Sequence, residues 1–219
     1  MKKFLISIAL FLTGVSALSA AIATEPETLD MLLAGEVVAF DTKSDESGGS
    51  AHMQILVQAP PQAIWNVIIS CELAFAFVDG LTHCEVLEET GDRALVHQVV
   101  KRGWPIPTQD FTFESLRQPY SEIVFRLVEG NLKAMEGYWR FTIRPEGTLV
   151  DYEVRVKPEI PVPRFIVRRN ISKGMPDLLA CVRGLAGGSG KESRAQADLD
   201  RCPGSTEGLP VKGGPPASQ

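Results

Sequence analysis

Residues 137–156 read GYWRFTIRPEGTLVDYEVRV, and this stretch decides the fold. Apolar and polar residues alternate with a period of two on both sides of a Pro-Glu-Gly-Thr segment at 145–148, which predicts a β-hairpin. A two-residue loop at Glu146-Gly147 would give these cross-strand pairs: Ile143 with Val150, Phe141 with Tyr152, Trp139 with Val154, Arg140 with Glu153 and Glu136 with Lys157. One face of the hairpin is then apolar and the other carries opposite charges. Because an isolated hairpin is only marginally stable in water, another element must cover the apolar face.

The composition of the whole chain suits one globular domain with appended segments. The chain has 219 residues, of which 44% are hydrophobic and 22% charged, and its formal net charge is −5. A protein that binds nucleic acid would be expected to carry a basic surface. The weak acidic excess therefore argues against nucleic acid as a partner.

Residues 1–23 have the features of a secretory signal peptide. Lys2-Lys3 precede a long apolar run, and Ala21-Ile22-Ala23 form an A-x-A cleavage site. The run is also long enough for an uncleaved membrane anchor, which is the alternative interpretation. We expect cleavage near Ala23 and a periplasmic or secreted protein.

The four cysteines agree with export, since an even number in the mature chain suits an oxidising compartment. Proximity in sequence favours a disulfide between Cys71 and Cys84, which would stabilise the fold by about 3 kcal/mol. A disulfide between Cys181 and Cys202 is less favoured, because Cys202 lies in a segment without hydrophobic periodicity. No C-x-x-C motif occurs and the three histidines are dispersed, so no metal site is expected.

The remaining elements follow one another in a simple order. Strands are expected over 35–42, 51–59, 83–89, 94–102, 108–116 and 123–128, with short helices over 62–70 and 72–78. A helical stretch over 164–186 carries an apolar stripe at Met175, Leu178, Leu179 and Val182, and should be kinked near Gly174 and Pro176. Residues 187–219 lack apolar content and periodicity, which predicts a disordered tail.

This order resembles the helix-grip superfamily, also called START-like or SRPBCC, in its polyketide cyclase/dehydrase and coenzyme Q-binding branch. The segments that carry the resemblance are APPQAIWNVI, AFVDGLTHCEVLEETGD, VEGNLKAMEGYWRFTIRPEGTLVDYEV and MPDLLACVRGLA. The resemblance implies an α+β fold in which a curved antiparallel sheet of about six to eight strands wraps around a long C-terminal helix. It also implies an elongated apolar cavity for a lipid, quinone, steroid or polyketide. It contains no catalytic signature, so it speaks for the fold more than for an activity.

The resulting domain plan has four parts. They are a signal peptide at 1–23, an N-terminal extension with one strand at 24–49, the helix-grip domain at 50–186 and the tail at 187–219.

Ten apolar or aromatic residues are candidates for the cavity wall. Any one of them could instead belong to an ordinary core, but as a set, given the resemblance, they favour a ligand site. They are Phe113, Phe125, Leu127, Trp139, Phe141, Tyr152, Val154, Met175, Leu178 and Leu179. The hydroxyl of a buried Tyr152 needs a partner, which a bound polar head group, a backbone carbonyl or a water could supply.

Other polar residues are candidates for chemistry, yet each also has a structural interpretation. By strand parity Asp110, Glu114, Asp151 and Glu153 point outward, which favours ion pairs over acid–base catalysis. His97 has no nucleophile or acid beside it in the sequence, although a general base there stays open. The cations Arg164, Arg168, Arg169 and Lys173 could contact an anionic head group or membrane surface, or could form a solvated helix face.

We therefore expect an exported protein that binds an apolar small molecule or lipid non-covalently, without a cofactor and without chemistry on the ligand. The alternative is a cyclase or dehydratase that folds a reactive chain in the same cavity. An inward-facing His97 or Asp110 would favour that enzyme, whereas an apolar wall would favour binding. A second alternative is a protein-interaction module whose groove is filled by its own side chains. Protein partners and oligomeric state have no signal in the sequence.

Overall fold

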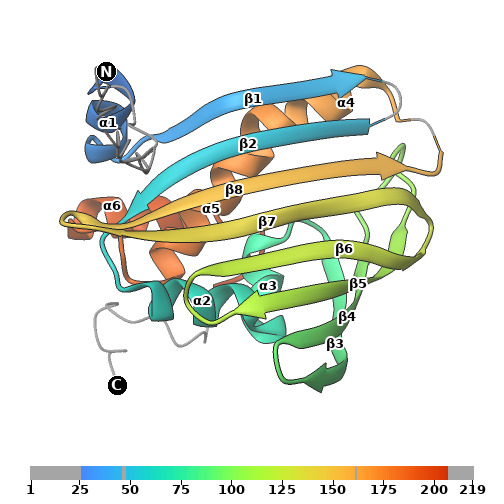
Figure 1. Cartoon of the computed structure of the whole chain (residues 1–219). Helices are drawn as coiled ribbons and strands as arrows, with labels where there is room; N and C mark the ends of the chain where they lie inside the picture. Colours follow the sequence, from blue (N-terminus) through green and yellow to red (C-terminus); the bar gives the residue numbers. More distant parts are fainter. Residues whose placement is uncertain (1–25, 46–47, 161, 207–219) are drawn as a thin grey trace, which may run out of the picture.

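One curved antiparallel sheet dominates the computed structural model, which describes residues 26–45, 48–160 and 162–206. Within these ranges eight strands pair in the order β1-β2-β8-β7-β6-β5-β4-β3 (Figure 1). The strands are β1 (Val37–Asp45), β2 (Gly48–Val57), β3 (Leu81–Thr90), β4 (Arg93–Val100), β5 (Gln109–Gln118), β6 (Glu122–Gly130), β7 (Leu132–Arg144) and β8 (Gly147–Pro158). The meander from β3 to β8 is thus extended by the β1–β2 hairpin, which joins it where β2 pairs with β8.

Most of the helices lie on the inner face of this sheet. The described helices are α1 (Pro26–Leu33), α2 (Pro61–Ile69), α3 (Cys71–Phe77), α4 (Arg164–Arg169), the π-helical turn η1 (Asn170–Gly174), α5 (Met175–Leu185) and α6 (Glu192–Leu199). The continuous segment α4-η1-α5 packs along β1 and β2, and α5 also packs against α2 and α3. By contrast, Leu32 of α1 packs on the outer face with Leu56 and Leu149. The predicted helix-grip α+β fold is confirmed.

The predicted kink in the C-terminal helix takes the form of the π-helical turn. Pro176 is at the start of α5 and has no amide hydrogen to donate, so a regular i to i−4 ladder is interrupted there. The widened turn of η1 lies immediately before it. A short helix therefore precedes a longer one, as the sequence indicates.

The predicted register of the β7–β8 hairpin was wrong by two residues. The turn lies at Pro145-Glu146, and the observed pairs are Arg144 with Gly147, Ile143 with Thr148, Phe141 with Val150, Trp139 with Tyr152 and Glu136 with Arg155. Gly147 is a strand residue with φ of +139°, and a side chain on it would collide with the carbonyl oxygen of Val57. Glycine is therefore needed at this position because the backbone of β2 lies too close for a side chain. It does not belong to the turn. Because the register is shifted by an even number of residues, every side chain stays on the face of the sheet that was predicted for it.

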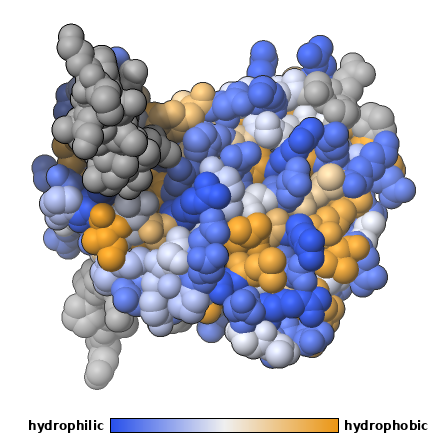
Figure 2. Space-filling view, viewed as in Figure 1, coloured by the Kyte–Doolittle hydropathy of each residue, from blue (hydrophilic) through white to orange (hydrophobic). Residues whose placement is uncertain are grey.

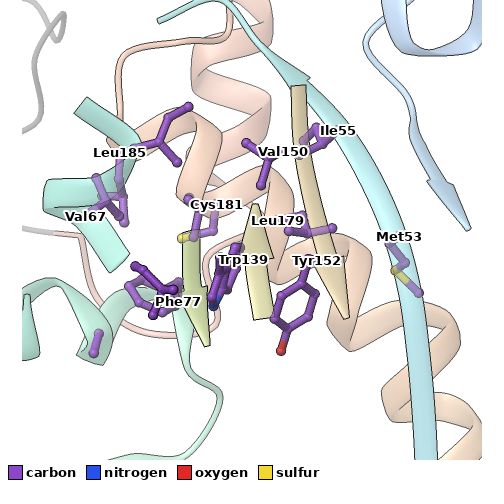
Figure 3. Packing of buried hydrophobic residues seen from close by; sticks show 14 of the residues in the cluster. Met53, Ile55, Val67, Phe77, Trp139, Val150, Tyr152, Leu179, Cys181 and Leu185 are labelled. Atoms are coloured by element: carbon purple, nitrogen blue, oxygen red, sulfur yellow. The ribbon is translucent and has the colours of Figure 1, made fainter. Parts of the chain in front are cut away.

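The core lies where α5 crosses the inner face of β2, β7 and β8. Ile55, Val150 and Leu179 are at most 1% exposed and pack together there (Figure 3). Trp139 and Tyr152 continue this apolar surface along β7 and β8. The amphipathic stripe of the C-terminal helix is therefore the cover that the hairpin needs.

Two disulfides link α3 to the sheet and α5 to the segment that follows α6. Cys71 at the start of α3 is bonded to Cys84 on β3, as predicted from their proximity. Cys181 of α5 is bonded to Cys202, which follows α6. No described cysteine is free. The less favoured of the two predicted pairings is therefore also formed.

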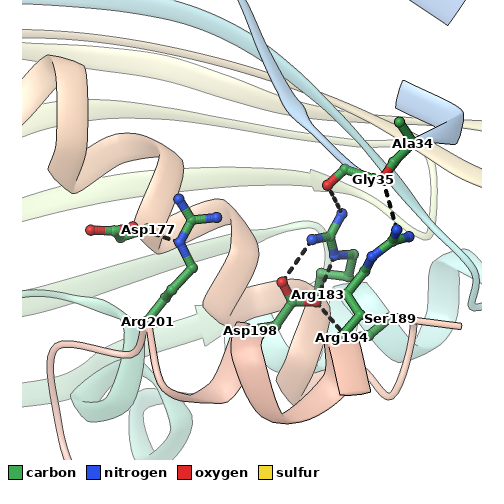
Figure 4. Close-up of polar contacts among 8 residues, drawn as sticks. All are labelled: Ala34, Gly35, Asp177, Arg183, Ser189, Arg194, Asp198 and Arg201. Carbon is green, nitrogen blue, oxygen red and sulfur yellow. Dashed lines mark hydrogen bonds and ion pairs between the residues drawn. The ribbon is translucent and has the colours of Figure 1, made fainter. Parts of the chain in front are cut away.

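The prediction of a disordered tail from residue 187 needs correction, because residues 192–199 form α6. Arg183 and Asp198, each 2 to 3% exposed, form a two-point ion pair with N···O distances of 2.8 and 2.7 Å (Figure 4). Ser189 donates to the same carboxylate, and Arg183 donates to the carbonyl of Gly35. A buried ion pair and a disulfide hold α6, so hydrophobic periodicity could not reveal it. Residues 207–219 and the predicted signal peptide lie outside the described residues.

Replacing Asp198 with alanine should lower the free energy of unfolding by about 3–5 kcal/mol, because the buried Arg183 guanidinium loses its carboxylate partner. The matched control is Asp177→Ala, which removes a more exposed ion pair with Arg201 at 2.8 Å. It should cost at most about 1 kcal/mol. Urea unfolding measures both variants, and equal losses of stability would contradict a structural role for the buried pair.

Candidate binding cavity

A cavity of about 290 Å³ lies between the sheet and the helices. Protein interiors rarely contain voids much larger than one water, whose share of liquid volume is about 30 Å³. This space is therefore too large to be a packing defect. Its wall runs along β5 from Gln109 to Arg117, a span of roughly 27 Å for an extended strand.

The structure brings most of the predicted wall residues together at this cavity. Seven of the ten line it: Phe113, Phe125, Trp139, Tyr152, Val154, Met175 and Leu178. The other three belong to the surrounding core. Leu127 packs partly buried against it, Phe141 contacts Trp65 edge-on with ring centroids 6.2 Å apart, and Leu179 is 1% exposed. That these residues bind a ligand remains a prediction.

Aromatic side chains form two groups in the wall, one on β7 and β8 and one on β5 and β6. The rings of Trp139 and Tyr152 lie 4.1 Å apart between centroids, and those of Phe113 and Phe125 lie 6.3 Å apart. The ring of Phe125 occupies the space over Gly137, where a side chain would collide with it. The absence of a side chain at Gly137 therefore leaves room for the Phe125 ring on the wall.

Several polar residues of the wall were missed by the sequence prediction, which gave Tyr152 as the only inward polar group. The additional polar side chains include Ser70, Gln98, Arg102, Gln109, Ser115, Arg117 and Asn170. Arg117 is 8% exposed and donates to Ser115 at 3.3 Å and to Glu89 at 2.6 Å. The signal for Ser115 and Arg117 was present, because they share the parity of Phe111 and Phe113 on β5.

The Tyr152 hydroxyl is one polar group of the wall that makes no hydrogen bond to the described residues. The residue is 5% exposed, and no hydrogen-bond partner for its hydroxyl is found among the described residues. Figure 3 shows the hydroxyl directed away from Val150 and Leu179. Burial raises the pKa of the Tyr152 phenol well above its usual range, so it stays protonated and can donate a hydrogen bond. A ligand oxygen in the cavity is one acceptor that would satisfy it.

The carboxylates that could be mistaken for catalytic groups lie on the outer face, as parity predicts. Asp110 contacts His97 at 2.8 Å, and Asp151 contacts His52 at 2.7 Å. Figure 2 shows this face, where hydrophilic side chains are spread between apolar ones. His97 is next to Gln98, which lines the cavity, so alternation turns the imidazole outward. Neither His97 nor Asp110 is available to a ligand in the cavity.

Three outer-face ion pairs involve Arg140 or Glu114. The predicted partner of Arg140 was Glu153, but the observed register places Arg140 opposite Asp151 on β8, and its ion pair is with Glu122 on β6 at 2.5 Å. Glu114 lies between Arg93 at 2.5 Å and Arg126 at 2.6 Å. Hydrogen bonds from Arg93 and Arg126 hold the pKa of the Glu114 carboxyl below its usual range.

The described residues contain neither a metal-binding cluster nor a helix that could cross a membrane. No group of three His, Cys, Asp or Glu side chains is placed to hold a metal ion in the part of the chain that the structure covers. No described helix combines the length and apolar character needed to cross a bilayer.

A family model for polyketide cyclase / dehydrase and lipid transport matches residues 57–183, more than half of the chain. The chain belongs to this family. The match runs from the end of β2 to α5 and thus includes most elements of the cavity wall. A search of curated proteins gave no match.

The chain is also similar to several solved structures. A STAR-related lipid transfer protein fragment from Xanthomonas axonopodis has a TM-score of 0.55 and 13% identity, over 69% of this chain and 92% of that one. The di-domain ARO/CYC StfQ from the steffimycin biosynthetic pathway has a TM-score of 0.51 and 13% identity, over 74% of this chain and 54% of its own. A START superfamily protein from Mycobacterium smegmatis is 17% identical, with a TM-score of 0.49 and coverage of 61% and 92%. At such identities the similarity establishes the START-like fold alone.

Stability should depend on the Glu114 carboxylate in a way that changes with pH. The folded pKa is lower than the unfolded value of about 4.3, so the contribution is present above that value and is lost as pH falls through the folded pKa. Glu114→Gln should therefore be less stable than the parent at pH 7, and the difference should shrink in acid. Urea unfolding from pH 7 to pH 3 measures this, with the exposed turn variant Glu146→Gln as control. A difference that does not change with pH would contradict the assignment.

Proposed function

We propose that this protein binds one apolar small molecule or lipid, such as a lipid, quinone or polyketide-like compound, non-covalently and without changing it. The observation that carries the proposal is the 290 Å³ cavity with an aromatic wall and the unsatisfied Tyr152 hydroxyl. Ligand sites of this kind combine a predominantly apolar surface with a few polar groups that orient the ligand. The family description names lipid transport as well as cyclase and dehydrase chemistry, so it supports a hydrophobic ligand in either case.

Binding is favoured over chemistry by the composition of the wall. Its described residues include no histidine, aspartate or glutamate side chain that could accept a proton from a ligand. Tyr152 stays protonated, and Arg117 is held by Glu89 and Ser115. A cyclase that works only by folding its substrate is the alternative. The second alternative was a protein-interaction module whose groove is filled by its own side chains. Such a module would contain no internal void, so the observed cavity disfavours it.

The proposed ligand has an apolar body and at least one oxygen that can accept a hydrogen bond. The apolar body would contact the rings of Phe113, Phe125 and Trp139, and the oxygen would accept from Tyr152. We further propose that the mature protein acts outside the cytoplasm, with residues 1–23 removed on export. The two disulfides support an oxidising compartment.

Native mass spectrometry of the exported protein, purified without detergent, should detect a bound species that denaturation releases. Val154→Phe should reduce occupancy, because the larger side chain enters the cavity. The matched control is Arg155→Phe, which makes a similar change on the neighbouring exposed position of β8 and should keep the ligand. Recovery of ligand-free protein that takes up no lipid, quinone or sterol-like probe would contradict the proposal. Conversion of a bound polyketide-like chain to a lighter, dehydrated product would instead establish the cyclase alternative.

Removing the Tyr152 hydroxyl should weaken binding without harming the fold. Tyr152→Phe should raise the Kd of the extracted ligand roughly two- to tenfold, as expected for the loss of one neutral hydrogen bond. Thermal stability of the ligand-free protein should be unchanged or higher, because an unsatisfied buried hydroxyl is lost. Titration of the ligand against both proteins measures the effect. Equal Kd values would show that the ligand does not use this hydroxyl.

A further inference from the structure

Three exposed apolar side chains lie on the loops at one end of the cavity. Of the large hydrophobic residues in the described ranges, Trp104 is 96% exposed, Phe165 66% and Ile160 59%, and only Ile143 of the others exceeds 53%. Exposed large side chains that gather in one place mark an interaction site more often than scattered ones do. We call Trp104, Ile160 and Phe165 the rim.

The rim residues are on segments that also form the cavity wall. Trp104 is in the β4–β5 connection, whose Arg102 and Ile106 line the cavity. Ile160 and Phe165 are near Val162 and Ile166, which line it as well. Figure 1 shows the β4–β5 and β8–α4 connections at the same end of the sheet, opposite the β7–β8 turn. The rim residues are therefore on the loops that form this end of the cavity.

Four cations that form no ion pair with the described residues accompany the rim. Residues 159–174 contain four cations, Arg164, Arg168, Arg169 and Lys173, and Glu159 as their one carboxylate. All four are exposed, and none forms an ion pair with any other described residue. The nearby carboxylates of Asp79 and Asp177 are already paired with Arg102 and Arg201. This surface is basic even though the whole chain has a net charge of −5.

We propose that the rim docks onto an anionic lipid bilayer, with Trp104, Ile160 and Phe165 entering the interface and the four cations contacting lipid phosphates. Interfacial binding requires apolar area together with attraction to anionic lipids, and tryptophan is favoured at the boundary between water and hydrocarbon. Trp104 is almost completely exposed, so it is free to enter a deformable bilayer and forms no preformed pocket for a rigid protein partner. A docked rim would place the loop end of the cavity against the membrane, where a lipid-like ligand would enter.

Vesicle co-sedimentation of the full exported chain tests this docking. Vesicles containing phosphatidylglycerol should bind the protein, and phosphatidylcholine vesicles should bind it less, with binding to the anionic vesicles falling as salt is raised. Trp104→Ser combined with Phe165→Ser should reduce partitioning into both vesicle types. Arg168→Ser combined with Arg169→Ser should reduce binding to anionic vesicles roughly tenfold or more, and should narrow the difference in binding between the two lipids, because Arg164 and Lys173 remain.

The matched control is the double variant Ile143→Ser with Arg144→Ser. It removes one exposed apolar residue and one cation without an ion pair to any described residue at the end of β7. There Arg144 pairs with Gly147, the first residue of β8, roughly 40 Å along that twelve-residue strand from Pro158. Its vesicle binding should equal that of the parent. All variants carry the same N-terminus, so a retained apolar leader would affect them equally. Absence of binding to anionic vesicles, or equal binding by the rim and control variants, would overturn the proposal.

Cavity occupancy is measured on the same samples, so the two proposals can fail separately. Rim variants that lose vesicle binding should still hold a ligand by native mass spectrometry, because none of the changed side chains lines the cavity. A loaded protein that ignores anionic vesicles would overturn docking alone. An empty protein that still binds them through the rim would overturn the proposed ligand function alone.

Discussion

The inner face of the sheet is wider than the helix that covers it. Eight strands spaced about 4.8 Å apart extend over roughly 34 Å, whereas a helix with its side chains is about 10–12 Å across. The segment α4-η1-α5 lies along β1 and β2, and α3 closes the opposite edge beside β3. The inner face of the strands between them is covered only in part: core side chains of α2 and α5 pack on β7 and β8, and the remainder borders the cavity. The cavity follows from this mismatch in width, so its position is set by topology and its shape by the side chains that fill the remainder.

The faces of the strands could be predicted from sequence, but their register could not. Alternation with a period of two identifies Trp139 and Tyr152 as inward residues in any register that differs by an even number. The alternation cannot distinguish among these registers. The close contact of Gly147 with β2 selects the observed one. The predicted strand at 108–116 also ended too early. Because β5 continues to Gln118, the inward Arg117 was left out of the predicted wall.

Which apolar residues border empty space was also beyond the sequence. Phe141 and Trp139 are two residues apart on one strand and share a face, yet Phe141 packs against Trp65 whereas Trp139 borders the cavity. The difference depends on where α2 ends relative to the sheet, which no local pattern encodes. Helix α6 was missed for a related reason: Asp198 and Cys202 are stabilised by partners on α5, and periodicity within their own segment is weak.

The C-terminal helical segment is anchored most firmly at its C-terminal end. Its final turns are fixed by the Cys181–Cys202 bridge and by Arg183, which joins α6 to the backbone at Gly35. Its first segment, α4, has no buried residue, and the π-helical turn separates it from the fixed part. The two ends of the cavity therefore differ in how the C-terminal helix is anchored: by a covalent bond and a buried ion pair at one end, and by packing on β1 and β2 at the loop end.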